Sequence, residues 1–539
     1  MPHNDRFDVA VIGAGHNGLV CAFYLAKAGL DVVVFERAEI VGGAAITEEF
    51  APGFRNSVAS YTVSLLQKRI IDEMDLGSQG LEIVQRPMAN YSLQPDGPGL
   101  EIHRDAAATA ACIRRHSRAD AERYPRFLSE LARITRFLKS TMLEAPVAPG
   151  AGATEWWRTL RLATRAAVTL GPAHVRRFGD VLTQSAGHWL DGWFESPLLK
   201  GTLGFDAIVG NFASPYAPSS GYLLLHHALG ETGGVAGAWG HAVGGMGSIT
   251  QAMERAAAAQ GVDIRVACPV SRIERRAGGF DVHTAEGAVV RAHQVAGAIH
   301  PQTLFLELLD PASLPDAFVE RIGAWKSESA SFRINVALSE LPRFVGEAGE
   351  GARGRLGSGI LISPSLEYLE AAHRDAVATG QSRQPVIETL IPSTIDASLA
   401  PEGRHVASLF CQHFARSPPG GPAWRDLRQH AIDRIIGTVD DYAPNFSRSI
   451  LAVQAFSPED LEARFGLIGG DIFHGRMTLD QLYWNRPARG YAQYRTPLEG
   501  VYLCASGAHP GGGVSGAPGR NAARALLEDR KRRATRRGR

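Results

Sequence analysis

A glycine loop near the start of the chain joins a strand-like run to a helix-like run. Residues 7–12 are rich in Val and Ile, as a buried parallel strand is, and GAGHNG follows them directly. A helical run and a second strand, DVVVFE, come next. This order predicts a Rossmann-type β-α-β unit that binds a dinucleotide. Gly13 would permit the tight turn, Gly15 would let a pyrophosphate approach the backbone, and Gly18 would allow close helix packing.

The end of the second strand narrows the choice of nucleotide. Glu36 suits the 2′-hydroxyl of a ribose, and an acid there disfavours NADP, whose 2′-phosphate would prefer an arginine. Arg37 comes next, and the doublet Gly42-Gly43 follows within a few residues. This doublet resembles the second glycine motif of FAD enzymes of the glutathione-reductase and amine-oxidase type.

A second glycine loop lies near the other end of the chain. The segment GAHPGGGVSGAPGRNAA, residues 507–523, contains a G-x-G-x-x-G at Gly511, Gly513 and Gly516, between a strand-like run and a helix-like run. Only one helix and a basic tail follow, so a second nucleotide domain has no room. We therefore expect the second loop to form another wall of the first dinucleotide's site. The N-terminus of its helix would then stabilise negative charge on a reduced flavin.

The stretch GVYLCASGAHPGGGVSGAPGRNAA closely resembles the C-terminal flavin motif of phytoene-desaturase-like oxidoreductases. It is most similar to the branch that holds the carotenoid ketolases and the pyridine nucleotide-disulphide oxidoreductase domain-containing proteins. Residues 233–274, AIHPQTLFLELL and FGLIGGDIFHGRMTLDQLYWNRP resemble other parts of the family. The resemblance implies FAD as cofactor. Together with the glycine loops it assigns to FAD the residues Gly13, Gly15, Asn17, Gly18, Glu36, Arg37, Gly42, Gly43, Val270, Gly507, Gly513 and Gly516.

The resulting expectation is an α/β fold with an α+β substrate part. A discontinuous FAD-binding domain would comprise residues 1–65, 230–300 and 495–530. A substrate domain with a helical segment would comprise residues 66–229 and 301–494. Residues 531–539 would be a disordered basic tail, with contact to anionic lipid or RNA as the alternative.

Composition excludes several classes of function. The net charge is only +1 although the last ten residues hold seven Arg or Lys and no acid, so the body of the chain gives no reason to expect nucleic acid. The five cysteines are scattered, without the spacing of a redox dithiol or a zinc site, so we expect no metal. No signal peptide and no apolar run of membrane-spanning length are visible, which favours the cytoplasm.

One predicted helix carries a basic and an apolar face. In EWWRTLRLATRAAV, Arg158, Arg161 and Arg165 share one face, and Trp157 and Leu160 lie opposite. Such a helix either covers the substrate domain or rests on a membrane surface, where it could collect a lipophilic substrate.

A flavin without a dithiol accepts hydride from a C–H or N–H bond. The expected enzyme is an FAD-dependent dehydrogenase or desaturase for a hydrophobic, carotenoid-like or amine substrate, reoxidised by an external acceptor such as oxygen or a quinone. His509 is the first candidate for a catalytic residue, with a structural role at the helix entry as its alternative; His241 and His474 are further candidates. An NAD(P)H-dependent flavin reductase and a flavin-bound regulatory protein remain open alternatives.

Overall fold

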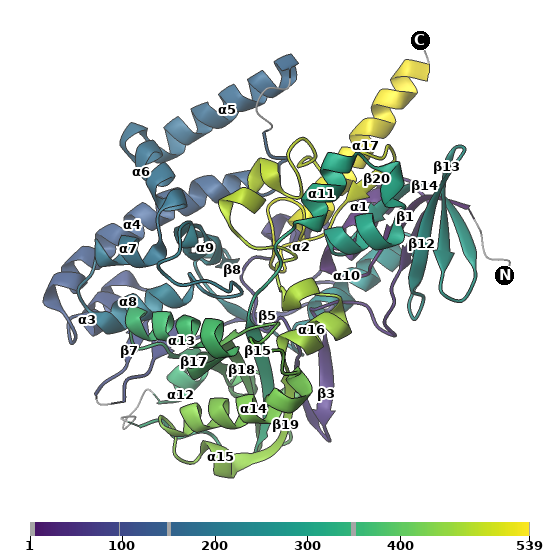
Figure 1. Cartoon of the computed structure of the whole chain (residues 1–539). Helices are drawn as coiled ribbons and strands as arrows, with labels where there is room; N and C mark the ends of the chain where they lie inside the picture. Colours follow the sequence, from purple (N-terminus) through teal and green to yellow (C-terminus); the bar gives the residue numbers. More distant parts are fainter. Residues whose placement is uncertain (1–5, 96, 148–151, 346–351, 538–539) are drawn as a thin grey trace.

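The computed structural model of the chain describes residues 6–95, 97–147, 152–345 and 352–537, which form two sheets and the helices that cover them (Figure 1). Among these residues no helix is long and apolar enough to cross a bilayer. The first sheet has the strand order β11-β2-β1-β14-β13-β12, and β20 pairs with β14. Its strands are β1 (Arg6–Ile12), β2 (Val32–Phe35), β11 (Asp263–Arg265), β12 (Val270–Arg276), β13 (Gly279–Thr284), β14 (Val289–Gly297) and β20 (Val501–Leu503).

Three distant segments of the chain supply this sheet. β1 pairs in parallel with both β2 and β14, and β20 joins β14 in parallel from the far end of the sequence. These strands lie within the three ranges expected for the FAD-binding domain. Helices α1 (His16–Lys27), α10 (Gly247–Ala259) and α17 (Ala517–Arg537) cover the sheet, and their buried apolar side chains share one core with it.

The second sheet has the order β19-β15-β18-β17-β16-β6-β7. Its strands are β6 (Asn90–Ser92), β7 (Leu100–Ile102), β15 (Ser331–Leu338), β16 (Gly359–Ile362), β17 (Gln381–Leu390), β18 (His405–Phe414) and β19 (Ile450–Phe456). Helix α14 (Trp424–Asp440) packs on this sheet in one core, with Trp424, Ile435 and Val439 buried.

Most of the remaining helices lie together on one side of the molecule, from α13 beside the second sheet to α5 farthest from it (Figure 1). They are α3 (Ala106–Ile113), α4 (Arg118–Thr141), α5 (Gly152–Leu170), α6 (Pro172–Thr183), α7 (Ala186–Asp191), α8 (Pro197–Phe205), α9 (Ser220–His227) and α13 (Leu366–Thr379). Short helices α2 (Lys68–Glu73), α11 (Asp316–Gly323), α12 (Ala352–Leu356), α15 (Phe446–Ser449) and α16 (Pro458–Phe465) lie in the connections. Two-stranded pieces are β3 (Thr47–Ala51) with β4 (Phe54–Ser57), β5 (Ile83–Gln85) with β10 (Gly240–Ala242), and β8 (Glu231–Thr232) with β9 (Val235–Ala236).

The basic end of the chain differs from the expectation of a disordered tail. Helix α17 continues without a break to Arg537 and projects from the body (Figure 1). Arg530, at the start of this stretch, pairs with Asp8 at 2.9 Å, and Arg533 pairs with Glu499 at 2.8 Å. These ion pairs and the hydrogen bonds of the helix keep α17 helical beyond the last apolar residues that pack on the core.

Glycines let α1 pack tightly against its neighbours. A Cβ on Gly18 would lie 2.0 Å from the carbonyl oxygen of Gly13, and Gly13 itself has a φ of +100°. A Cβ on Gly519 would lie 2.1 Å from the carbonyl oxygen of Asn17. Helix α17 can therefore touch the backbone of α1 only because Gly519 lacks a side chain, and Gly18 allows α1 to fold back onto its own glycine loop.

Gly519→Ala tests this close approach. The methyl group would meet a backbone atom, so helix α17 must shift away from α1, and we expect unfolding to become easier by about 1–3 kcal/mol. Denaturant unfolding followed by circular dichroism measures the change. The control is Gly437→Ala in α14, where an added Cβ meets nothing within 4 Å and stability should stay equal or rise by up to about 1 kcal/mol. Equal stability of both variants would contradict the packing argument.

Candidate functional site

A cavity of about 590 Å³ runs between the two sheets. At one end it is lined by the first glycine loop, by Glu36 and by Val270. At the other end it is lined by side chains of the second sheet, among them Glu388 of β17 and Phe410 of β18. The cavity therefore connects the predicted dinucleotide site with the substrate part of the fold.

The first loop presents open backbone to this cavity. Gly15 is the N-cap of α1, with φ −66°, and no side chain caps the helix. A Cβ on Gly15 would meet nothing within 4 Å. The free N–H groups at the start of α1, together with its dipole, suit an anion such as a diphosphate. The Gly42 N–H donates to the Ala14 carbonyl oxygen at 2.9 Å and holds the glycine doublet beside this loop.

Glu36 is fixed at the edge of the same cavity. Its Oε2 accepts the Ala14 N–H at 2.8 Å, and its Oε1 accepts the Ala38 N–H at 3.0 Å. The carboxylate is 7% exposed and is placed to accept further hydrogen bonds from a ribose. Arg37 also lines the cavity, and its Nη2 donates to the Arg464 carbonyl oxygen at 2.9 Å.

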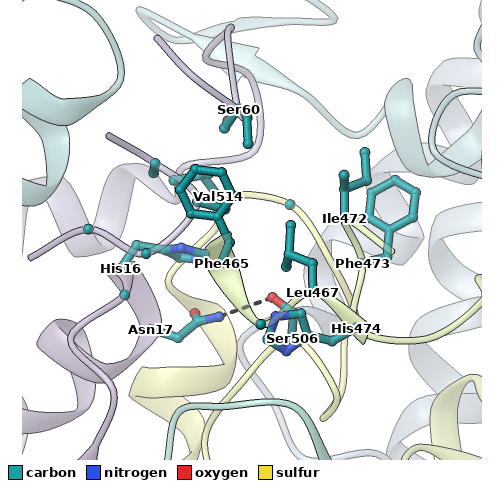
Figure 2. A pocket seen from close by; sticks show the side chains of 18 of the residues that line it. His16, Asn17, Ser60, Phe465, Leu467, Ile472, Phe473, His474, Ser506 and Val514 are labelled. Atoms are coloured by element: carbon teal, nitrogen blue, oxygen red, sulfur yellow. Dashed lines mark hydrogen bonds between the residues drawn. The ribbon is translucent and has the colours of Figure 1, made fainter. Parts of the chain in front are cut away.

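The two glycine loops meet at one point. Asn17 Nδ2, from the first loop, donates to Ser506 Oγ, from the second, at 3.3 Å (Figure 2). Gly513 and Val514 of the second loop line the same cavity, and the His16 ring interacts with the backbone of Gly513. The two loops are thus walls of one site, not two separate nucleotide sites.

Several buried polar atoms around this point have no protein partner in the described part of the chain. They are His16 Nε2, Asn17 Oδ1 and His474 Nδ1. Burial lowers the pKa of His16 to about 4 and that of His474 to about 3, so both rings are neutral at pH 7. Because buried polar groups are normally hydrogen-bonded, these atoms are placed to bind a polar cofactor.

The three histidines considered as catalytic candidates occupy different places. His474 lines the cavity and lies beside Ser506 (Figure 2). His241 does not line it: its Nε2 contacts Asp396 Oδ2 at 2.8 Å, and Asp396 also accepts the Gly244 N–H at 2.8 Å. His509 lines a second cavity of about 360 Å³ between α4, α5 and α17.

Three of the glycines assigned to FAD do not line the cavity but act in packing. Gly18 packs against Gly13, a Cβ on Gly507 would lie 2.3 Å from Pro301, and a Cβ on Gly516 would lie 2.8 Å from Ile70. The other assigned residues, namely Gly13, Gly15, Asn17, Glu36, Arg37, Gly42, Gly43, Val270 and Gly513, line it.

The sequence did not reveal the inner end of the cavity. Tyr61 donates to Glu388 Oε2 at 2.5 Å, and Arg86 contacts Glu388 Oε1 at 3.4 Å. Asp206 lines the same end. No motif marks these residues because they come from unrelated loops and strands that only the fold brings together. His16 and Ser506 were also missed, although they lie inside or next to the glycine motifs.

The three arginines of helix α5 line the second cavity, although Arg161 is also exposed to solvent. Arg165 donates to the Ser140 carbonyl oxygen and to Glu144, both at 3.0 Å, and Arg158 pairs with Glu155 at 3.0 Å. The opposite face is open: Trp156 is 59% and Trp157 60% exposed. The arrangement is the reverse of a helix that presents arginines to a membrane surface.

Elsewhere one group of metal-ligand types occurs among the described residues, formed by Glu101, His103 and Cys112. Its carboxylate is already paired: Glu101 contacts Arg355 at 2.8 Å and His103 at 2.8 Å. The guanidinium supplies the positive charge that a metal ion would bring.

Comparison with known proteins agrees with this site. Residues 18–332 match the family described as flavin containing amine oxidoreductase. The chain belongs to this family. The flavoprotein is also 40% identical over 549 residues to the pyridine nucleotide-disulfide oxidoreductase domain-containing protein 2 of Rattus norvegicus, covering 98% of this chain and 94% of that one. It is 26% identical to the hydroxyneurosporene desaturase of Cereibacter sphaeroides, covering 97% of each chain.

Solved structures share the fold of this flavoprotein. Wild-type putrescine oxidase bound to putrescine superposes with a TM-score of 0.59 at 16% identity, covering 97% of this chain and 98% of that one. The predicted α/β fold, the FAD cofactor and the oxidoreductase class are therefore confirmed. The open backbone at Gly15 and the unpartnered atoms of His16, Asn17 and His474 fit this cofactor.

Gly15→Ala separates cofactor binding from folding. Since φ at Gly15 suits any residue and the Cβ meets no protein atom, the variant should melt like the parent without cofactor. Its methyl group would occupy the approach to the diphosphate, so we expect FAD affinity to fall at least about tenfold. Flavin absorbance after reconstitution measures the affinity. Gly18→Ala is the contrasting variant, because it should lose stability as well; unchanged FAD affinity in Gly15→Ala would contradict the placement of the diphosphate.

Proposed function

We propose that the enzyme abstracts hydride from a hydrophobic or amine substrate, and that an external acceptor, oxygen or a quinone, then reoxidises the cofactor. The observation that carries this proposal is the cavity of about 590 Å³, which leads from the two glycine loops to the face of the second sheet. When bound, FAD supplies the hydride-accepting ring. A relative is named as a hydroxyneurosporene desaturase and a protein of similar fold as a putrescine oxidase, which supports both substrate classes.

Different parts of the cavity would bind different parts of the cofactor and the substrate. The start of α1 would bind the diphosphate, Glu36 the ribose, and the backbone around Val270 the adenine. Phe473, Ile472 and Leu467 present apolar side chains to the cavity (Figure 2), where they would exclude water and hold an apolar substrate.

His474 is the histidine that we propose to act in the reaction. Its neutral ring can accept a hydrogen bond at Nδ1, the atom without a protein partner. His300 lies beside it, with ring centroids 5.5 Å apart, and His300 Nε2 contacts Ser327 Oγ at 3.0 Å. Because burial disfavours the protonated ring, His474 would orient the substrate or the cofactor through a hydrogen bond at Nδ1 and would not take up a proton.

The test is anaerobic titration of the FAD-loaded enzyme with candidate reductants, each added alone. We expect a polyene precursor or a secondary amine to bleach the visible flavin absorbance, while NADH and NADPH leave it unchanged. Bleaching by NADH or NADPH alone would instead support a flavin reductase. No bleaching by any organic substrate would support a flavin-bound regulatory protein.

We also propose that the face carrying α5 makes a peripheral contact with a lipid bilayer, through its tryptophans and not its arginines. The outward face of α5 bears Trp156, Trp157, Leu160 and Val168, which are 43–81% exposed. Helix α17 rises on the same side in Figure 1, and both helices line the second cavity. The exposed cations Lys531, Arg532 and Arg536 near the end of α17 would attract anionic headgroups.

Sedimentation with vesicles tests this contact. The enzyme should pellet with vesicles of phosphatidylcholine and phosphatidylglycerol, and Trp156→Ser with Trp157→Ser should reduce the bound fraction at least about threefold. The matched control is Val377→Ser with Leu451→Ser, since both are 53% exposed but lie on other elements. Equal binding of the two double variants, or none by the parent, would rule the contact out; a tryptophan-dependent dimer in gel filtration would assign the face to a second copy.

A further inference from the structure

Asp206 is the one carboxyl group at the inner end of the cavity without a hydrogen-bond or ion-pair partner among the described residues. It lies at the C-terminal cap of α8, and its partly buried side chain lines the cavity. Burial, with a smaller contribution from the charge of Glu388, raises its pKa to about 7. A buried carboxyl group in this position is costly unless something in the cavity binds it.

The neighbouring groups do not supply a positive charge to Asp206. Arg86 is engaged by Glu388 at 3.4 Å and by Thr62 Oγ1 at 2.5 Å. The guanidinium carbon of Arg333 lies 4.4 Å from the centroid of the Tyr61 ring, and Arg333 Nη2 donates to Ser408 Oγ at 2.7 Å. Arg333 is therefore held outside the cavity.

The nearest histidine is also no counter-ion. Burial lowers the pKa of His227 to about 4, although hydrogen bonds to the Leu223 and Asp206 carbonyl groups act in the opposite direction. Its ring is therefore neutral at pH 7. Trp239 stacks on it with ring centroids 6.4 Å apart and adds an aromatic surface to the cavity wall.

Three features at this end attract a cation. The C-terminal carbonyl groups of α8 carry the negative end of the helix dipole, Asp206 caps them, and Glu388 adds a second carboxylate. The rings of Trp239 and Phe410 line the same region and can pack against the alkyl chain of a bound amine.

We propose that Asp206 binds a protonated amine on the substrate, with Glu388 strengthening the field. This inference rests on the proposed function in one respect, namely that the inner end of the cavity holds the substrate. It narrows the substrate class to amphiphilic amines: a plain hydrocarbon would leave the buried carboxyl group without a partner. Asp206 is thus a specificity-determining residue.

Calorimetric titration of the FAD-loaded enzyme with dodecylamine, dodecanol and dodecanoate tests the assignment. These probes share one chain and differ only in the polar end. We expect dodecylamine to bind tightest and dodecanoate weakest. Asp206→Asn should weaken dodecylamine binding roughly 10- to 100-fold and change dodecanol binding by less than about threefold. Equal affinity for amine and carboxylate, tighter binding of the alcohol than of the amine, or unchanged amine binding in Asp206→Asn would overturn the proposal.

Two further measurements keep the outcome clear. Asp441→Asn is the matched control, since Asp441 is also the C-terminal cap of a helix but is exposed on α14. Because the folded state keeps a proton on Asp206 that the unfolded chain releases as the pH rises above the ordinary pKa of 3.8, this carboxyl destabilises the fold at neutral and alkaline pH. Asp206→Asn should therefore melt higher than the parent at about pH 8 and the same at about pH 4.

Failure of this inference and failure of the proposed function can be told apart. Absence of flavin bleaching by any organic substrate would remove the proposed function, while the amine titration of the FAD-loaded enzyme still reports on Asp206. If an organic substrate bleaches the flavin while Asp206→Asn leaves the affinity for dodecylamine unchanged, that combination contradicts only the inference about Asp206.

Discussion

The contact between the first and the last glycine loop is the constraint on which the cofactor site depends. Asn17 reaches Ser506 across the loops, and the backbone of Asn17 packs directly on Gly519. Cys21 and Cys504 lie at the same junction; burial and the hydrogen bond with Cys21 raise the pKa of the Cys504 thiol well above its ordinary value. Each of these contacts joins α1 to the segment around β20 and α17, so the sheet, the loops and the cavity form as one unit.

Burial gives the two ends of the cavity different chemistry. Around the loops it keeps His16, His474 and His300 neutral, so that these rings offer hydrogen bonds without charge. At the inner end it acts on carboxyl groups, where Glu388 is satisfied by Tyr61 and Arg86 while Asp206 is not. Desolvation is the main cause of the pKa shifts at both ends. It lowers the pKa of the histidines near the loops, so they carry no charge, and it raises the pKa of Asp206, which has no hydrogen-bond partner among the described residues.

Local patterns in the sequence were sufficient to predict the fold class, and nine of the twelve residues that they assign to FAD line the cavity. The strand, glycine loop, helix and acid around Gly13 and Glu36 act within one short segment, so spacing alone predicts their arrangement. The inner end of the cavity could not be predicted in this way, since Asp206 and Glu388 meet only after the second sheet forms. The prediction of a disordered tail was wrong for the described residues up to Arg537. Arg530 and Arg533 form ion pairs with Asp8 and Glu499, which are remote in sequence, and these pairs stabilise the end of α17.

The pairing of the loops also has a consequence for biosynthesis. The residues joined by the Asn17–Ser506 hydrogen bond are 489 positions apart in the chain. At typical rates of translation, roughly 25 to 100 seconds separate the synthesis of the two. Throughout that interval the finished β-α-β unit has no opposite wall, and once β14 has been made, the edge that β20 later covers stays unpaired. A nascent chain can therefore bind FAD only weakly. Tight binding of the cofactor begins late, after the segment around β20 has been made and has paired with β14.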